Sequence, residues 1–423
     1  MADPTERGTF GIEFEFFPTA IAQWTAADIQ AYANTYTYLG SKINGSETAE
    51  ALGQLYPGAL VVPREFLGNK GVYIINNIIK LLRERGVHTN DIDNLCQPIL
   101  PQESTIISQA SPFNANSTRD IYHHWSVTED GSVESSSTYN PAQQQQRDSY
   151  LEAEMKSCNG IELISPALTD TPQSFQEVMK VFTIVKGLNF MHINDTCGLH
   201  VHVAFGKHAI TMVPLRKIAC LLFALDPFLA ALRPDSRSGN NEHCQSIRKF
   251  SNAARGHKLA DAIKGLKNPG RSIIDPEEPD YFDPQPKPNV VDWVPIPDAV
   301  EAIKSCKKPE EVAWLLTTQG RANYDFKKFL DGTLNPTIEF REHEATLDAP
   351  EVVAWSRFCV RVVRYAALNM TDDEFNEIVM ICHDVEENPN PDRFALWELF
   401  VIMKLEDEAF DLKVPRPKPT NKA

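Results

Sequence analysis

The chain has 423 residues, of which 42% are hydrophobic and 23% charged, a composition typical of a globular protein that can bury a large core. Its net charge of −16 repels phosphate backbones, so we expect no nucleic-acid partner. An anionic protein that acts on anionic substrates needs metal ions or local arginine clusters to reverse its own field.

The sequence shows no sign of a membrane or secretory destination. The N-terminus, Met-Ala-Asp-Pro-Thr-Glu-Arg-Gly, lacks the apolar region of a signal peptide, and no apolar run reaches the roughly 20 residues of a transmembrane helix. The eight cysteines are scattered without a CxxC pair, so neither a zinc ribbon nor a disulfide framework is indicated. We therefore expect a cytoplasmic protein with reduced thiols and no membrane partner.

Hydrophobic periodicity predicts strands and helices in irregular order along the chain. Strands are expected at 9–17, 122–128, 160–164, 198–205 and 337–341. Helices are expected at 71–85, 172–188, 214–232, 350–369, 372–383 and 394–411. Strands scattered among helices, without regular βαβ units, indicate an α+β fold with an antiparallel sheet.

The pattern is consistent with a single catalytic domain that spans residues 1–423. Two parts differ in character: a Pro/Asp-rich excursion at about 234–335, most irregular at 268–298, and a Pro/Lys-rich tail at about 412–423 that we expect to be mobile. The chain has no GxxxxGK[ST] and no GxGxxG motif. If ATP binds, it does so without a P-loop or a Rossmann turn.

Three predicted strands carry chemically reactive side chains on one face. Side chains alternate between faces along a strand, so residues two apart share a face. This alternation groups Glu13 with Glu15 in GIEFEFF, His200 with His202 in GLHVHVAF, and Glu339 with Arg341 and His343 in TIEFREHE. For one strand alone, an ordinary solvent face explains such residues equally well. Three strands that offer only carboxylates, imidazoles and one guanidinium instead indicate a bound hard cation such as Mg²⁺ or Mn²⁺.

Taken in order, these motifs resemble those of the amidoligase family, within the glutamine synthetase and glutamate–cysteine ligase superfamily. The resemblance rests on CGLHVHV and TIEFREHEATLD, supported by HWSVTEDGSV and GIELISP, and covers most of the chain from residue 10 to about 365. It is weakest at 17–115 and 234–320, and Ala345 stands where the family often has Gly. The resemblance implies a curved antiparallel sheet that forms a catalytic funnel, backed by helices, with nucleotide and metal on its concave face.

The resemblance also implies roles for individual residues. The expected ligands of Mg²⁺ or Mn²⁺ are Glu13, Glu15, Glu162, His200 and Glu339. The expected contacts of ATP are His202 and Arg341, with Arg237, Arg248 and Arg321 as further candidates. The expected catalytic set is Arg341, Glu339, Asp130 and His343, in which Asp130 is a candidate base.

The implied reaction joins a small-molecule carboxylic acid to an amine, with ATP activating the acid as an acyl phosphate. A metal-dependent hydrolase or oxygenase built on His200 and His202 is the alternative, although no Glu follows the pair as it does in a cupin-like site. A nucleotide-binding module without catalysis is a second alternative. The sequence leaves the identity of the acid, the identity of the amine and the oligomeric state open.

Overall fold

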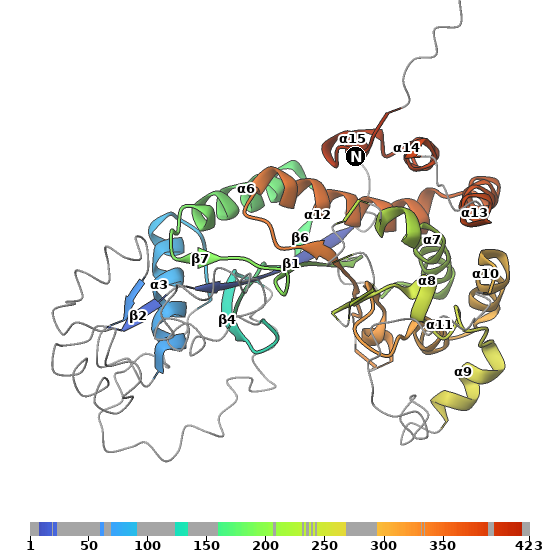
Figure 1. Cartoon of the computed structure of the whole chain (residues 1–423), viewed down its shortest axis with the longest axis horizontal. Coiled ribbons are helices and arrows are strands. Elements are labelled where there is room, and N and C mark those ends of the chain that lie inside the picture. The colour runs from blue at the N-terminus through green and yellow to red at the C-terminus, as the bar shows by residue number, and fades with distance from the viewer. Residues whose placement is uncertain are drawn as a thin grey trace, which may run out of the picture.

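One antiparallel sheet of eight strands organises the chain, with helices packed on it (Figure 1). The structure is a computed structural model and describes residues 8–18, 20–22, 60–62, 69–90, 123–133, 160–205, 209–230, 232–233, 237, 240–241, 243–267, 294–330, 332–333, 335–387 and 393–416. The excursion segment 268–293, the tail 417–423 and the predicted strand residue Tyr122 lie outside these ranges.

The strands of the sheet follow the order β11-β12-β8-β1-β5-β4, and β6 and β7 pair with the two ends of β1. Their bounds are β1 Thr9–Pro18, β4 Ser126–Asp130, β5 Gly160–Ile164, β6 Leu168–Thr169, β7 Met191–His192, β8 Gly198–Ala204, β11 Tyr324–Asp325 and β12 Ile338–Glu344. All of these pairings are antiparallel, which confirms the α+β expectation. The sheet is not strongly curled, so the funnel shape that the resemblance implied is not found.

Two further pairs of short strands lie outside the main sheet. They are the parallel pair β2 Ala20–Ala22 and β3 Leu60–Val62, and the antiparallel pair β9 Asn240–Asn241 and β10 Cys244–Gln245.

The helices agree with the sequence expectation to within a few residues, except that the single helix expected at 394–411 is two helices, interrupted at 403–405 where Lys404 has a positive φ of 60°. Their bounds are α3 Lys70–Glu84, α6 Pro172–Lys186, α7 Met212–Ala230, α8 Ile247–Phe250, α9 Leu259–Leu266, α10 Ile296–Ser305, α11 Pro309–Leu316, α12 Ala349–Arg364, α13 Asp372–Glu387, α14 Arg393–Ile402 and α15 Glu406–Asp411. A 3-10 turn, η5 Lys327–Phe329, follows β11, and a π-helical turn, η6 Tyr365–Asn369, extends α12. None of the described helices is both long and apolar enough to cross a membrane.

Helices α6 and α12 cover one face of the sheet and pack against each other (Figure 1). Helix α6 begins where Thr171 accepts a hydrogen bond from the Ser174 amide and Pro172 occupies the first turn, and it ends at Gly187. Its apolar side meets the even-numbered residues of β1, because Phe10 stacks on Phe175 with ring centroids 5.1 Å apart.

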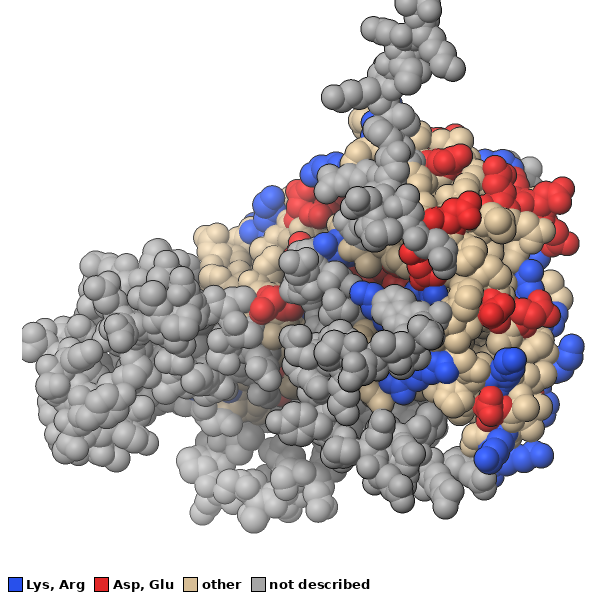
Figure 2. Space-filling view, turned by 45° about the vertical axis from the view of Figure 1, so that its right-hand side comes forward, with Lys and Arg blue, Asp and Glu red and all other residues tan. Residues whose placement is uncertain are grey.

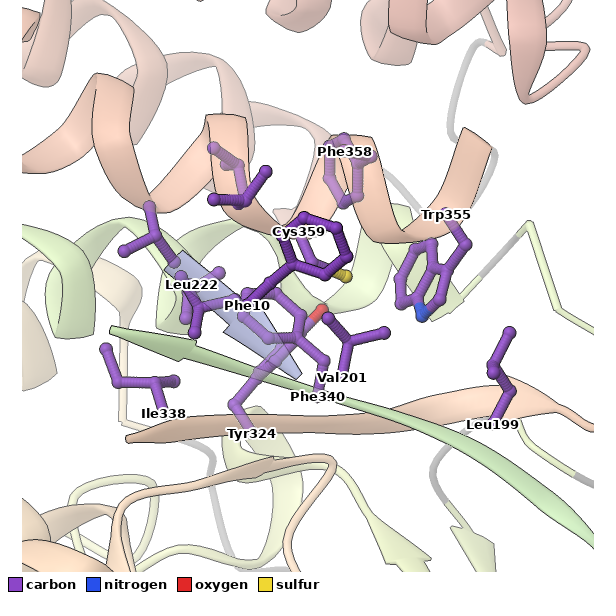
Figure 3. Packing of buried hydrophobic residues seen from close by; sticks show 14 of the residues in the cluster. Phe10, Leu199, Val201, Leu222, Tyr324, Ile338, Phe340, Trp355, Phe358 and Cys359 are labelled. Carbon is purple, nitrogen blue, oxygen red and sulfur yellow. The ribbon is translucent and has the colours of Figure 1, made fainter. Parts of the chain in front are cut away.

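The core lies between these helices and the sheet (Figure 3). Phe340 of β12 and Val201 of β8 are fully buried against Trp355 and Phe358 of α12. Each such side chain contributes about 1.5–3 kcal/mol by leaving water. Because the apolar residues of β1, β8 and β12 all point to the helices, the alternate residues of these strands are brought together on the opposite face.

The outer surface reflects the acidic composition. Figure 2 shows acidic side chains gathered over the C-terminal helices, where Asp372, Asp373, Glu406 and Asp407 are exposed.

Candidate active site

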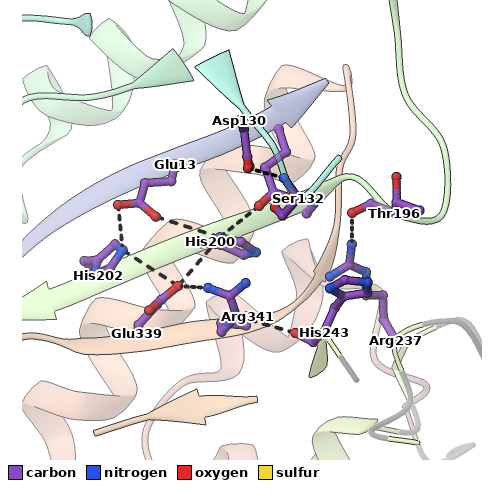
Figure 4. A network of polar contacts seen from close by, with 12 residues as sticks. Glu13, Asp130, Ser132, Thr196, His200, His202, Arg237, His243, Glu339 and Arg341 are labelled. Atoms are coloured by element: carbon purple, nitrogen blue, oxygen red, sulfur yellow. Dashed lines mark hydrogen bonds and ion pairs between the residues drawn. The ribbon is translucent and has the colours of Figure 1, made fainter. Parts of the chain in front are cut away.

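The cross-strand register brings the carboxylates and imidazoles of four strands to one face of the sheet (Figure 4). Residues directly opposite each other on neighbouring strands share a face, with Cβ atoms about 4.5–5.5 Å apart. The opposed pairs are Glu13 with His200, Glu15 with Glu162, and Glu339 with His202. Together with Asp130 at the end of β4, these residues form what we call the carboxylate–histidine cluster.

His200 lies at the centre of the carboxylate–histidine cluster. Its Nδ1 atom is 3.8 Å from Glu13 Oε2, 3.6 Å from Glu15 Oε1 and 3.6 Å from Glu339 Oε1. His202 Nε2 lies 3.0 Å from Glu13 Oε1 and 3.9 Å from Glu339 Oε1. The side chain of His200 is 2% exposed and that of Glu13 29%, so the cluster runs from the interior to the edge of the solvent.

Crowding of like charges shifts the protonation of Glu162. Burial, followed by the negative charges of Glu13, Asp130 and Glu15, raises the pKa of Glu162 to about 9. A carboxyl with that pKa keeps its proton at neutral pH. The protein without a cation therefore holds fewer negative charges on this face than its residues could provide.

Neighbouring carboxylates favour the protonated, positively charged form of His202. Burial lowers its pKa, but the carboxylates of Glu13 and Glu339 outweigh burial and raise the pKa to about 9. Burial likewise raises the pKa of Glu13, yet the charge on His202 and hydrogen bonds from both histidines hold it well below its ordinary value. At neutral pH, His202 is thus a cation that neutralises part of the acidic face.

The residues of the cluster fit a divalent cation. Three sets have ligand atoms within 4.8 Å of one another: Glu13, Glu162 and His200; Glu13, His202 and Glu339; and Glu15, Asp130 and Glu162. Ligands at about 2.1 Å from an octahedral ion lie about 3.0 Å apart when adjacent and about 4.2 Å when opposite. Within these sets His202 Nε2 lies 3.0 Å from Glu13 Oε1, which matches adjacent ligands. The separations of 3.8 Å between His200 Nδ1 and Glu13 Oε2 and of 3.9 Å between His202 Nε2 and Glu339 Oε1 are closer to the distance of opposite ligands. Carboxylates with an imidazole suit Mg²⁺ or Mn²⁺.

Close backbone packing fixes the two imidazole rings. A Cβ atom at Gly198 would lie 2.5 Å from His200 Nε2, so any larger residue here would displace the ring. The Gly198 amide donates to Glu15 Oε2 at 2.7 Å. His202 Nδ1 contacts Thr337 Oγ1 at 3.0 Å, which aims Nε2 at Glu13. The glycine that begins β8 is therefore part of the site.

Two arginines flank the cluster at one end (Figure 4). Arg341 forms an ion pair with Glu339 through Nη1 and donates from Nε to the carbonyl of His243 at 3.4 Å. Arg237 is buried and donates from Nη2 to the Thr196 carbonyl at 3.0 Å. The structure thus places Arg341 beside the carboxylate of Glu339, whereas Arg237 contacts backbone carbonyls beyond it. His243, which lies in no recognisable sequence motif, contacts Arg341 through its carbonyl.

The expectation that His343 shares a face with Glu339 and Arg341 is wrong. The register of β12 against β8 shifts after Phe340, so that three steps along β12, to His343, match two steps along β8. This β-bulge reverses the alternation. His343 therefore lies on the helix-covered face, with its ring centroid 5.2 Å from that of Trp355. Burial there, followed by the charge of Arg233, holds the pKa of His343 well below its ordinary value.

Arg248 and Arg321 are not brought to the cluster. The buried guanidinium of Arg248 makes two hydrogen bonds of 2.7 Å to the carboxylate of Glu386 and one of 2.8 Å to the carbonyl of Val294. These partners tie α8 to α13. The side chain of Arg321 is exposed, and its carbonyl accepts from the amide of Gln245 at 2.7 Å.

Asp325 is a site residue that sequence reasoning missed. It lies on β11 directly opposite Glu339, on the same face. Burial, with the charge of Glu339 adding to it, raises the pKa of this carboxyl, although bonding to Lys327 opposes the rise. A strand of two residues has no alternation to reveal it.

Comparison with known protein families identifies the class of this chain. Residues 6–264 match the model of the family described as "Putative amidoligase enzyme". The match covers more than half of the 423 residues, and the chain belongs to this family, whose name implies an enzyme that forms amide bonds. The matched region contains β1, β5 and β8, whereas β12 lies beyond it. Searches of curated proteins and of solved structures found no match.

Proposed function

We propose that the protein is an ATP-dependent carboxylate–amine ligase that joins a small-molecule acid to an amine through an acyl phosphate. The observation that carries this proposal is the convergence of Glu13, Glu15, Glu162, His200 and Glu339, with Arg341 beside them, on the face of the sheet opposite α6 and α12. Membership of the amidoligase family supports the same reaction class.

The cluster is the proposed site of Mg²⁺ or Mn²⁺, because its three candidate ligand sets overlap: Glu13 belongs to two of them and Glu162 to two. A divalent ion there would neutralise the negative charge that ATP phosphates and a substrate carboxylate bring to an acidic surface. Glu339 would join Glu13 as a ligand on the side nearer Arg341.

Arg341 is the proposed contact of the phosphoryl group in transfer. Its Nη1 and Nε atoms are engaged by Glu339 and by the His243 carbonyl, while Nη2 has no partner among the described residues. A guanidinium held rigidly on two sides can direct its third nitrogen at a phosphoryl oxygen without reorganising. His202, protonated at neutral pH, would add a second positive charge next to the phosphates.

The amine must lose a proton as it attacks the activated carbonyl. We assign the proton acceptor to Asp130, which closes β4 at the rim of the cluster, beside Glu15 and Glu162. The Ser132 amide donates to one of its oxygens at 2.7 Å and orients the carboxylate. No nucleophilic side chain takes part, since the substrate carboxylate itself receives the phosphoryl group.

A hydroxylamine trap tests this proposal. The purified protein is incubated with hydroxylamine, ATP, Mg²⁺ and pools of carboxylic acids. Released phosphate and the hydroxamate formed from hydroxylamine and the activated acid are measured together. A ligase that makes an acyl phosphate yields hydroxamate in proportion to phosphate, and only when both the acid and ATP are present. Replacing hydroxylamine by pools of amines then identifies the natural acceptor.

Two matched variants serve as controls. Glu339→Gln removes a charge from the cluster and should abolish hydroxamate, whereas Glu344→Gln, on the same strand but in none of the candidate ligand sets, should not. Phosphate release without hydroxamate would show that the protein hydrolyses ATP without activating an acid, and would refute the ligase proposal. Substrate cleavage that needs metal but no ATP would overturn the ligase and favour a hydrolase.

A further inference from the structure

The β-bulge in β12 decides which residue of this strand reaches the cluster. Phe340 pairs with Val201 and His343 with Leu199, so Arg341 and Glu342 together face the single residue His200. A bulge is a local departure from the ladder and persists only where the surroundings specify it. Something in the structure must therefore hold it.

A buried hydrogen bond holds the bulge from the helix-covered side. Tyr324 of β11 donates its hydroxyl to Glu342 Oε2 at 2.9 Å, and both side chains are fully buried. The Tyr324 ring packs edge-on against Phe340 with centroids 5.3 Å apart, just before the bulge begins (Figure 3). Burial raises the pKa of Glu342 to about 8, against the charge of Arg233, whose guanidinium stacks 3.9 Å above the Trp355 ring.

A second contact holds the backbone of the bulge from the edge of the sheet. The amide of Arg341 donates to the carbonyl of Asn323 at 2.8 Å. Asn323 is itself fixed, because its side-chain amide donates to the buried Asp226 of α7 at 2.8 Å. The residues adjacent in sequence, Asn323 and Tyr324, therefore contact the adjacent bulge residues Arg341 and Glu342.

We propose that Tyr324 and Glu342 are positioning residues for Arg341. Their hydrogen bond anchors Glu342, one of the two bulge residues, in the core. The other bulge residue, Arg341, is thereby held with its guanidinium beside Glu339 and the cluster. The catalytic consequence rests on the proposed ligase function, whereas the structural consequence does not.

The test removes the single hydroxyl with Tyr324→Phe and compares it with Tyr365→Phe, which removes the hydroxyl of another buried tyrosine, on η6. Hydrogen exchange measured by mass spectrometry on peptides that cover 338–344 should be about ten-fold faster in Tyr324→Phe and unchanged in Tyr365→Phe. Glu342→Gln keeps an oxygen that can accept the hydrogen bond from the Tyr324 hydroxyl, so exchange at 338–344 should match the wild type. Glu342→Leu has no such oxygen, and exchange there should be faster.

Kinetics separate positioning from a merely structural role. Tyr324→Phe should lower kcat about ten-fold with KM for ATP changed less than about two-fold, since a small misplacement penalises the transition state most. In an Arg341→Ala background the same substitution should cause no further loss, because it acts through a side chain that is already gone.

The outcomes discriminate between the two claims. Unchanged exchange at 338–344 in Tyr324→Phe would overturn the inference whatever the activity. Faster exchange with wild-type kcat, or with losses that add in the Arg341→Ala background, would overturn the positioning role. A wild-type protein that shows no ATP-dependent turnover would refute the proposed function, and the exchange comparison would still decide whether Tyr324 and Glu342 hold the bulge.

Discussion

Replacing Glu162 by glutamine should stabilise the protein in the absence of metal. The pKa of Glu162 is raised from 4.5 to about 9, so the folded protein at pH 7 holds a proton that the unfolded chain has released. Each pKa unit is worth about 1.4 kcal/mol, and the interval of 2.5 units from 4.5 to pH 7 sets an upper bound of about 3.5 kcal/mol. Partial contact with water reduces this, and we expect Glu162→Gln to gain about 1–3 kcal/mol.

The sign of the pH dependence follows from the same shift. Because the folded pKa lies above the unfolded one, the contribution of Glu162 to wild-type stability is most favourable below about 4.5 and is lost as the pH rises toward about 9. Glutamine has no proton to release, so the advantage of Glu162→Gln should be near zero at pH 4.5 and grow up to pH 9.

Urea denaturation in EDTA at pH 5, 7 and 8.5 measures this difference, with Glu301→Gln on the exposed side of α10 as the matched control. Added Mn²⁺ should then stabilise the wild type more than Glu162→Gln, because the variant lacks a ligand common to two candidate sets. A variant that is less stable than the wild type at pH 7 without metal, or a difference that does not change with pH, would refute the reasoning.

Three further predictions concern other parts of the site. Gly198→Ala puts a Cβ atom 2.5 Å from His200 Nε2, so calorimetric titration should show Mn²⁺ affinity at least about ten-fold weaker in a folded protein. The pKa of His202 is raised to about 9, so its ion pairs contribute stability that is present below about 6.5 and lost as the pH rises through about 9; metal-free denaturation midpoints should fall over this interval, and less so in His202→Gln. Arg248→Ala leaves the carboxylate of Glu386 partly buried and unpaired, so it should destabilise the protein by about 3–5 kcal/mol in urea denaturation. KM for ATP should stay unchanged, and a raised KM would show that Arg248 contacts the nucleotide.

Strand alternation predicted which side chains share a face, and this held wherever the strand was regular. In β1 the period of two is uninterrupted, so Glu13 and Glu15 project together while Phe14 and Phe16 enter the core. Alternation does not say which strands are neighbours. The placement of β8 between β1 and β12 depends on pairings between residues more than 100 positions apart, which the local sequence pattern does not encode.

The arginines show a second limit of sequence reasoning. Arg237, Arg248 and Arg321 look alike as sequence because each stands in a polar segment. Their positions differ because their hydrogen-bond partners are remote along the chain. Arg248 donates to the carboxylate of Glu386, whereas Arg237 donates to the carbonyls of residues 195 and 196. A charge in a loop can be assigned to a site only when the residues that compete for it are known.

The bulge in β12 shows why a motif need not act as a unit. The run Glu339 to His343 looks like one polar face, but six of the seven residues of β12 are buried, and the extra residue distributes the polar side chains over both faces of the sheet. Glu339 and Arg341 satisfy each other on the open face, and Glu342 is satisfied by Tyr324 in the core. A strand covered on both sides can retain this many ionisable groups only if each finds a partner on its own side. The charged residues of this motif therefore serve two purposes, since Glu339 and Arg341 build the cluster and Glu342 holds the strand in the register that the cluster requires.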